Sequence, residues 1–93
     1  MKRDLLRSNA FARELRNWLK SHPETSQAIT TALNQLSEDS THPSLRTHKL
    51  RGQLDGCWAC SAGYDLRIVF EYTQHEATEA ILLLALGTHD QVY

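Results

Sequence analysis

The stretch LRIVFEYTQHEATEAILLLAL, residues 66–86, decides the fold of this 93-residue chain. From Leu66 to Tyr72, apolar side chains at every second position alternate with Arg67, Val69 and Glu71, which is the period of a half-buried strand. The run from Ala80 to Leu86 is apolar on both faces, as expected of a central strand that is covered on both sides. The stretch therefore predicts two long strands at the heart of a sheet.

The segments just before this stretch predict a third strand and a loop. Cys57 to Ser61 lies between two glycines, at positions 56 and 63, and is interpreted as a strand. The polar segment SEDSTHPSLRTHKLRG, residues 37–52, contains a proline and ends on a glycine, so it is interpreted as a loop. Residues 4–7 are a weaker candidate for a short edge strand.

Two helices are predicted upstream, where the first 51 residues contain no glycine. Ser8 can cap a helix whose apolar residues fall on one face of a 3.6-residue repeat, namely Phe11, Leu15, Trp18 and Leu19. The pair His22-Pro23 ends that helix, because the residue before a proline resists the helical region. Pro23 then suits the first turn of a second helix, whose buried stripe is Ala28, Ile29, Ala32, Leu33 and Leu36.

Helices followed by strands predict an α+β fold, with a helical hairpin on one face of a small, mainly antiparallel sheet. Residues 1–93 fit one domain, and a composition of 41% hydrophobic and 23% charged residues is ordinary for a globular protein. The first 15 residues lack the apolar segment of a secretory signal, and the longest apolar run has seven residues where a membrane span needs about 20. We therefore expect a cytoplasmic protein without a membrane segment.

Charge is unevenly distributed in a chain whose net charge is −1. From Ser40 to Leu54 there is no acidic residue, while Arg46, Lys49 and Arg51 fall inside that window. A local basic stripe favours a focused anion site over broad coating of nucleic acid. The alternative is a solvated loop that happens to be basic.

The motif CWAC, with Cys57 and Cys60, suggests a redox or zinc site. On a strand, however, residues three apart point to opposite faces. No second Cys or His pair stands at zinc-finger spacing. We expect two reduced structural thiols.

Five residues at strand ends and in flanking loops can carry chemistry: His48, Asp65, Arg67, His89 and Tyr93. Two histidines can serve as base and acid in metal-independent RNA cleavage, because imidazole titrates near neutral pH. A guanidinium stabilises the charge that develops on the phosphate, and a tyrosine can stack on a base. Ordinary turn roles for the histidines, and a structural ion pair of Arg67 with Glu71 or Asp65, remain alternatives.

A metal centre made of His48, Asp65 and His89 is the competing interpretation, since two histidines and a carboxylate are a common ligand set. Against it, no two of these residues have the short spacing of ligands on one helix, and Lys49 and Arg67 would repel a cation. His22, His42 and His75 are interpreted as turn or surface residues, and Trp18 and Trp58 as packing residues.

The residues HPSLRTHKLRGQLDGCWACSAGYDLRIVFEY (42–72) and ILLLALGTHDQVY (81–93) closely resemble the RelE superfamily of type II toxins, nearest to its YafQ-like branch, which is common in plasmid-stabilisation loci. The resemblance implies a ribosome-dependent mRNA endoribonuclease that needs no cofactor and acts in the ribosomal A site. It also implies a cognate antitoxin, encoded beside the toxin, in a complex that is oligomeric.

Carried over by position, the resemblance assigns catalytic roles to His48, Asp65, His89 and Tyr93, and it matches Arg67 to a strand arginine of the superfamily that would bind phosphate. The basic stripe of Arg46, Lys49 and Arg51 is expected to add contacts to RNA phosphates. Ser61 stands where the YafQ-like pattern has a further histidine, and most of the lysines and arginines typical of RelE itself are missing. Two alternatives on the same scaffold are a ParE-like toxin that binds DNA gyrase without catalysis, and an inactive homologue that only binds an antitoxin.

Overall fold

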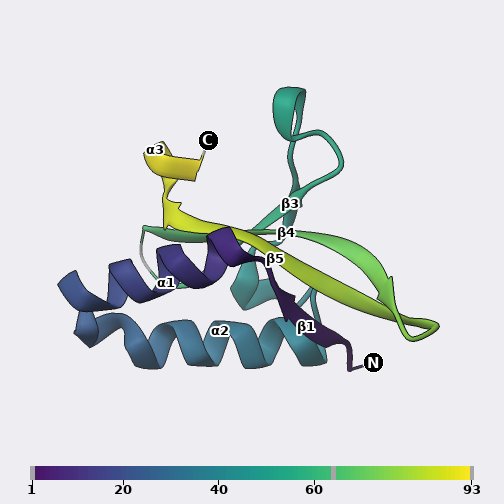
Figure 1. Cartoon of the computed structure of the whole chain (residues 1–93), viewed down its shortest axis with the longest axis horizontal. Helices are drawn as coiled ribbons and strands as arrows, with labels where there is room; N and C mark the ends of the chain where they lie inside the picture. Colours follow the sequence, from purple (N-terminus) through teal and green to yellow (C-terminus); the bar gives the residue numbers. More distant parts are fainter. Residues whose placement is uncertain (1, 64, 93) are drawn as a thin grey trace.

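Two helices lie against one face of a five-stranded mixed sheet in the computed structural model, which describes residues 2–63 and 65–92 (Figure 1). The strands follow the order β1-β5-β4-β3-β2, with β1 parallel to β5 and all other neighbours antiparallel. The elements are β1 (Asp4–Arg7), α1 (Asn9–Ser21), α2 (Ser26–Glu38), β2 (His48–Lys49), β3 (Trp58–Ser61), β4 (Leu66–His75), β5 (Thr78–Thr88) and α3 (His89–Val92), with short 3-10 turns at Pro23–Thr25, Pro43–Leu45 and Gly52–Leu54. The predicted α+β class and the edge strand at residues 4–7 are confirmed.

The ends of α1 are those that the sequence predicts. The Ser8 hydroxyl accepts a hydrogen bond from the backbone N–H of Phe11 at 3.0 Å, which caps the first turn. At the other end the backbone N–H of His22 donates to the Trp18 carbonyl at 2.8 Å, and Pro23 stops the helix there. Pro23–Thr25 forms a 3-10 turn, so α2 begins three residues later than predicted, at Ser26.

The sheet buries side chains on both of its faces. On the helix side, Phe11 and Leu36 pack with Ile68, Phe70 and Leu83, all fully buried. We call the opposite side of the sheet the outer face. It carries a smaller cluster formed by Leu50, Ala59 and Val69, against which Leu54, Cys57, Leu84, Ala85 and Val92 pack. The alternation predicted for β4 and the two-sided burial predicted for β5 are confirmed.

A β-bulge in β5 explains how its apolar run serves both faces. Val69 pairs with Ala85 and Phe70 with Leu83, so Leu84 is the extra residue. Leu84 and Ala85 both belong to the outer cluster, whereas Leu83 and Leu86 lie in the helix-side core. A bulge of this kind bends the strand and increases its twist.

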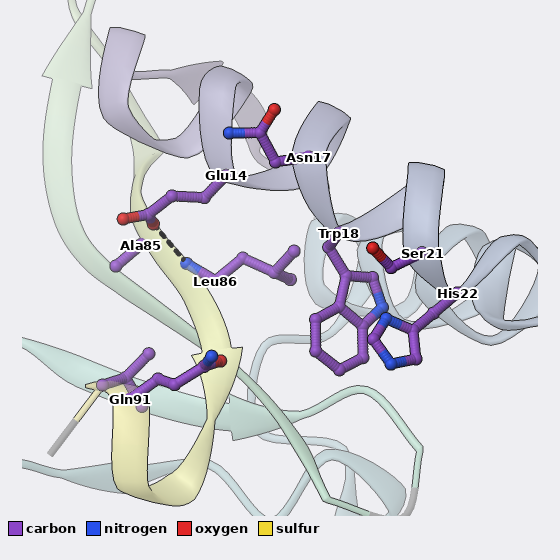
Figure 2. A pocket seen from close by; sticks show the side chains of 9 residues that line it. Glu14, Asn17, Trp18, Ser21, His22, Ala85, Leu86 and Gln91 are labelled. Carbon is purple, nitrogen blue, oxygen red and sulfur yellow. Dashed lines mark hydrogen bonds between the residues drawn. The ribbon is translucent and has the colours of Figure 1, made fainter.

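The edge of β5 beyond β1 is closed by side chains. Pairing with β1 ends at Arg7 and Leu83. The Glu14 carboxylate of α1 then accepts a hydrogen bond from the Leu86 N–H at 2.9 Å (Figure 2). The Gln91 side-chain oxygen accepts from the Thr88 N–H at 2.8 Å. Natural sheets cover exposed edges in this way because unpaired backbone groups promote association.

We expect Glu14→Ala to lower the free energy of unfolding by about 1–3 kcal/mol, because it leaves the Leu86 N–H without its partner in a partly buried position. Glu14→Gln retains an acceptor oxygen and should recover most of this loss. Urea unfolding of both variants measures the difference. Equal stability of Glu14→Ala and the parent chain would contradict this role for Glu14.

Two features of the second half differ from the sequence prediction. Residues 37–52 are not all loop, since His48 and Lys49 form the edge strand β2. A strand of two residues is too short to produce an alternating pattern of apolar and polar residues in the sequence. The β4–β5 hairpin also extends beyond the predicted strands, to a turn at Glu76 and Ala77 with positive φ angles of 51° and 67°. Such angles are usual for Gly or Asn in hairpin turns and rare for other residues. Because Glu and Ala stand here instead, the sequence did not indicate a turn at these positions.

Both cysteines are free thiols, as predicted, and they point to opposite faces of the sheet. Burial raises the pKa of Cys60 to about 12, although the nearby positive charge of Arg67 lowers it slightly. Burial, followed by the charges of Glu71 and Asp55, raises the pKa of Cys57. Neither thiol is primed to act as a nucleophile. Across residues 2–63 and 65–92, no helix has the length and apolar character required to cross a membrane.

Candidate functional site

Arg67 occupies the centre of a row of residues across three strands. It pairs with Ser61 of β3 on one side and with Gly87 of β5 on the other. Because Arg67 lies two residues before Val69, its side chain is on the outer face. The half-buried guanidinium donates through Nη1 to the Leu66 carbonyl at 3.2 Å. No carboxylate of the described residues forms an ion pair with Arg67, so the structural ion-pair interpretation is wrong.

Asp65 and His89 lie at the same end of the β4–β5 ladder as Arg67. Leu66 and Thr88 are paired across the two strands, and Asp65 and His89 are the next residues outward on each strand. Both side chains are exposed. His89 begins α3, and its Nδ1 lies 3.6 Å from the Asp90 carboxylate. This end of the ladder therefore brings a carboxylate and a guanidinium of one segment near an imidazole that lies more than 20 positions away in sequence.

His48 lies on the same outer face but nearer the edge of the sheet. It pairs with Ala59, which in turn pairs with Val69 in the outer cluster. Its row is two residues, or about 7 Å, from the row of Arg67, and β2 is three strands from β5, about 14 Å. The two histidines thus flank the central arginine and are not adjacent to each other.

The tautomer of the neutral His48 ring follows from its hydrogen bond. Nδ1 lies 3.0 Å from the Arg46 carbonyl oxygen, which can only accept. Nδ1 therefore carries the hydrogen, and the ring's lone pair is on Nε2. A histidine oriented through one nitrogen by a backbone carbonyl is a common arrangement for proton transfer at the other nitrogen.

The predicted basic residues of the 46–51 segment are all exposed but are not all on one face. Arg46 adopts a left-handed conformation, with φ of 51°, at the end of a 3-10 turn. Lys49 pairs with Trp58, which packs in the helix-side core, so Lys49 faces the side opposite His48. Arg51 lines a hollow of about 310 Å³ with Leu50 and Leu54.

Two separate segments rise from the outer face, α3 and the loop of residues 50–57 (Figure 1). Each is anchored to the outer cluster, α3 by Val92 and the loop by Leu50 and Leu54. Between their anchors the outer face is built by β3, β4 and β5. Tyr93, the last predicted site residue, lies outside the described residues.

Gly87 fixes the position of α3. A Cβ atom at this position would lie 2.9 Å from Gln91 Oε1, 3.0 Å from Gln91 Cβ and 3.2 Å from Val92 Cγ1. We expect Gly87→Ala to displace α3 while the sheet persists, which would change the amide resonances of residues 88–92 and leave those of β3 largely unchanged. A two-dimensional NMR spectrum of labelled protein checks this. Uniform changes across the sheet, or none near α3, would contradict it.

The metal-centre alternative is wrong in geometric terms. Within residues 2–63 and 65–92 no three His, Cys, Asp or Glu side chains come together as a metal-binding group. His48, Asp65 and His89 do not converge in this way. The strand order explains this result, because β2, which carries His48, is three strands away from β5, which ends just before His89.

Glu71 is a titratable residue of this face that the sequence did not assign to the site. It is half-buried on β4, four residues beyond Arg67 and on the same face. Its negative charge contributes to the raised pKa of Cys57, after burial. The alternation of β4 was sufficient to place it on this face.

A pocket of about 540 Å³ lies beside this face, between α1, the end of β5 and α3 (Figure 2). The His22 ring stacks on the Trp18 indole with centroids 3.9 Å apart and planes 14° apart. Among the described residues, the buried Nδ1 of His22 has no hydrogen-bond partner. Trp18 packs on the core and His22 ends α1, as predicted. That they line a pocket could not be predicted from their spacing in the sequence.

Sequence comparison identifies the family. A family described as "Bacterial toxin of type II toxin-antitoxin system, YafQ" matches residues 3–93. The chain belongs to the YafQ family. It is thus a toxin of the type II toxin–antitoxin class, as the resemblance predicted. No curated protein matches the chain.

Solved structures share the fold of this YafQ-family chain at low sequence identity. YafQ from E. coli strain BL21(DE3) is 13% identical, with a TM-score of 0.78 and 99% of each chain covered. A chain of the E. coli DinJ-YafQ toxin–antitoxin complex is 14% identical, with a TM-score of 0.76 over 100% of this chain and 99% of the other. The YoeB/ParE toxin from Agrobacterium tumefaciens is 12% identical, with a TM-score of 0.75 over 92% and 98%.

Proposed function

We propose that this YafQ-family toxin is a metal-independent endoribonuclease that cuts mRNA in the ribosomal A site. The observation that carries the proposal is the placement of Arg67 at the centre of the outer face, with His48 on β2 to one side and His89 at the start of α3 to the other. A phosphodiester between the two imidazoles would have a base on one side, an acid on the other and a cation beneath it. These three functions are those that RNA cleavage through the 2′-hydroxyl requires.

One histidine removes the proton from the ribose 2′-hydroxyl, whose oxygen then attacks the phosphorus. The phosphorus–5′-oxygen bond breaks, and the other histidine gives its proton to the leaving 5′-oxygen. The products are a 2′,3′-cyclic phosphate and a free 5′-hydroxyl. Arg67 binds the phosphate as charge builds on its oxygens, Asp65 orients a histidine, and Tyr93 stacks on the message.

The exposed basic residues Arg46, Lys49 and Arg51 would bind RNA phosphates away from the reacting bond. They are not held by ion pairs with carboxylates among the described residues. Such contacts would hold the message in place without selecting its sequence.

The natural partner we infer is a cognate antitoxin, a separate chain that binds the toxin into an oligomeric complex. Membership of a toxin–antitoxin family supports this, as does the fold shared with the toxin of the DinJ-YafQ complex. The system would act in the cytoplasm, where translated messages are found, and would stabilise the plasmid or locus that encodes it.

The decisive test is a purified translation system programmed with a defined message, in which cleavage sites are mapped as 5′ ends. The parent protein should cut inside the A-site codon, also in the presence of a chelator of transition metals, and His48→Ala should cut about tenfold to a thousandfold more slowly. A His42→Ala variant is the matched control, since His42 belongs to the same segment but bonds Ser44. If the protein is toxic to cells but cuts no message, and if it inhibits the supercoiling of DNA by gyrase, it is instead a ParE-like binding toxin.

A further inference from the structure

The segment between α2 and β2 is tied to the sheet through Ser40. Ser40 is 2% exposed and is the only buried polar residue among residues 2–63 and 65–92. Its hydroxyl lies 2.8 Å from the Tyr72 hydroxyl on β4 and accepts a hydrogen bond from Arg3 Nη1 at 3.4 Å. Its carbonyl accepts from the Thr47 hydroxyl at 2.5 Å. A buried polar group is stable only where it is hydrogen-bonded, so these contacts fix its place. We call Arg3, Ser40, Thr47 and Tyr72 the Ser40 network.

Both partners of the buried hydroxyl are themselves held in place. The Tyr72 ring stands edge-on to the rings of Trp58 and Phe70, with centroids 5.6 Å apart in each pair. The Arg3 guanidinium lies 5.4 Å from the centroid of the Tyr72 ring and forms an ion pair with Glu79. The network is therefore rooted in β3, β4 and β5 and in the segment that precedes β1.

Thr47 connects this network to the candidate site, because it stands between Arg46 and His48 in the chain. The Arg46 carbonyl, which bonds His48 Nδ1, belongs to the peptide unit that joins Arg46 to Thr47. A peptide unit is planar, so the position of Thr47 determines where that carbonyl points. The hydrogen bond from Thr47 to Ser40 therefore orients the contact that sets the tautomer of His48.

The backbone around His48 requires such support. Arg46 has a φ of 51°, a left-handed conformation that is unfavourable for a non-glycine residue and persists only where the surroundings impose it. Strand β2 has two residues and lies at the edge of the sheet, where pairing is easily lost. The bond from Thr47 to Ser40 closes residues 40–47 into one loop and supplies a fixed point beside the histidine.

The Ser40 network acts on His48 through the backbone and from behind the site. Tyr72, which bonds the Ser40 hydroxyl, packs against the helix-side core. His48 pairs with Ala59, which belongs to the outer cluster. The hydroxyls of the network therefore lie on the other side of the sheet from a substrate at the candidate site.

We propose that the Ser40 network positions His48 for proton transfer, by holding the Arg46 carbonyl against Nδ1 and so keeping the lone pair on Nε2. This inference rests on the proposed function, because it explains how a histidine on a two-residue edge strand stays aligned for catalysis. Thr47 and Tyr72 are positioning residues and take no part in the chemistry. Alignment matters because a displacement of about 1 Å can slow a reaction about a hundredfold.

The first test is the tautomer of His48, read from the ¹⁵N chemical shifts of its two ring nitrogens at about pH 8.5, where imidazole side chains are neutral. We expect the parent chain to carry the ring hydrogen on Nδ1 and Thr47→Val to show a mixture of both tautomers. Thr47→Ser keeps the hydroxyl and should keep the parent tautomer. Thr41→Val is the matched control, since Thr41 belongs to the same loop but its hydroxyl bonds Asp39 at 3.1 Å.

The second test is single-turnover cleavage of ribosome-bound mRNA. Thr47→Val should lower the rate at saturation by about tenfold to a hundredfold, because a proton-transfer group is misplaced. Its KM should stay within about twofold of the parent value, because no RNA contact is removed. Tyr72→Phe removes only the hydroxyl bonded to Ser40 and should also slow cleavage. The double variant should lose no more than the larger single loss, because both changes act along one path.

Three results would overturn the inference. They are a parental tautomer in Thr47→Val, the same change of tautomer in Thr41→Val, and parental cleavage by Thr47→Val despite mixed tautomers. Melting curves verify that each variant is folded, and Tyr72→Phe decides the question if Thr47→Val does not fold.

The tautomer measurement uses no RNA, so it separates this inference from the proposed nuclease activity. A parent chain that cuts no message, in which Thr47→Val still mixes the tautomers of His48, would reject the nuclease and retain the orienting role of the Ser40 network. Parental cleavage by Thr47→Val would reject the positioning role and leave the nuclease standing.

Discussion

Replacing His89 by alanine is expected to slow cleavage of ribosome-bound mRNA by about tenfold to a thousandfold, the contribution of a general acid or base. His89 lies at the end of the β4–β5 ladder, beside Asp65 and close to Arg67. Its side chain is 58% exposed and begins a short helix, so its removal should barely change stability. The measurement is the single-turnover rate on a programmed ribosome.

The pH dependence of that rate separates a proton-transfer role from a structural one. If His48 and His89 act as base and acid, the parent profile is bell-shaped and His89→Ala loses one limb. His75→Ala is the matched control, because His75 is an exposed histidine at the far end of β4. If His89→Ala cleaves at the rate of the parent chain, or keeps the bell-shaped pH–rate profile, then His89 takes no part in proton transfer.

Arg67→Gln is expected to reduce the rate by about a hundredfold to a thousandfold, as when a fixed donor to a developing negative charge is lost. Arg67 suits this role because its guanidinium is half-buried, is held by the Leu66 carbonyl and is not consumed by a carboxylate among the described residues. Arg67→Lys should recover only part of the rate, because an ammonium lacks the planar fork of donors.

Glu71→Gln provides the control for Arg67, since it changes a charge on the same strand and face. It should leave the rate within about threefold of the parent. The binding of uncleavable message, measured in parallel, shows whether Arg67→Gln acts on the chemical step or on binding. An undiminished rate in Arg67→Gln would rule out phosphate stabilisation by this residue.

Much of the fold could be predicted because its strongest signals are local. The cap at Ser8 and the stop at Pro23 bound α1, and the alternation of β4 assigns each side chain to a face. The edge strand β2 escaped prediction because a two-residue strand depends on its partner, here Trp58 and Ala59. Likewise α3 has four residues, too few for a helical period.

The candidate site was predictable as a set of residue types but not as an arrangement. The sequence indicated that Asp65, Arg67 and His89 flank strands, but the register of β4 against β5 decides that they meet at one end. The bulge at Leu84 shifts that register by a residue and leaves no mark in an all-apolar run. Lys49 is a second example. Adjacent residues of a strand face opposite sides of the sheet, and only the pairing of β2 with β3 reveals that Lys49 faces away from His48.

The parallel pairing of β1 with β5 also sets the order in which the toxin can fold. Asp4 pairs with Ala80 across almost the whole chain, and β5 stands between β1 and every other strand. Contacts so distant in sequence slow folding, because a large loop must close before they form. The helices and the first strands therefore have no complete sheet to pack on until β5 has been synthesised. A chain that stops short of residue 78 lacks Ile81, Leu83 and Leu86 of the core and Gly87 of the row around Arg67, so we expect premature termination to yield an inert product.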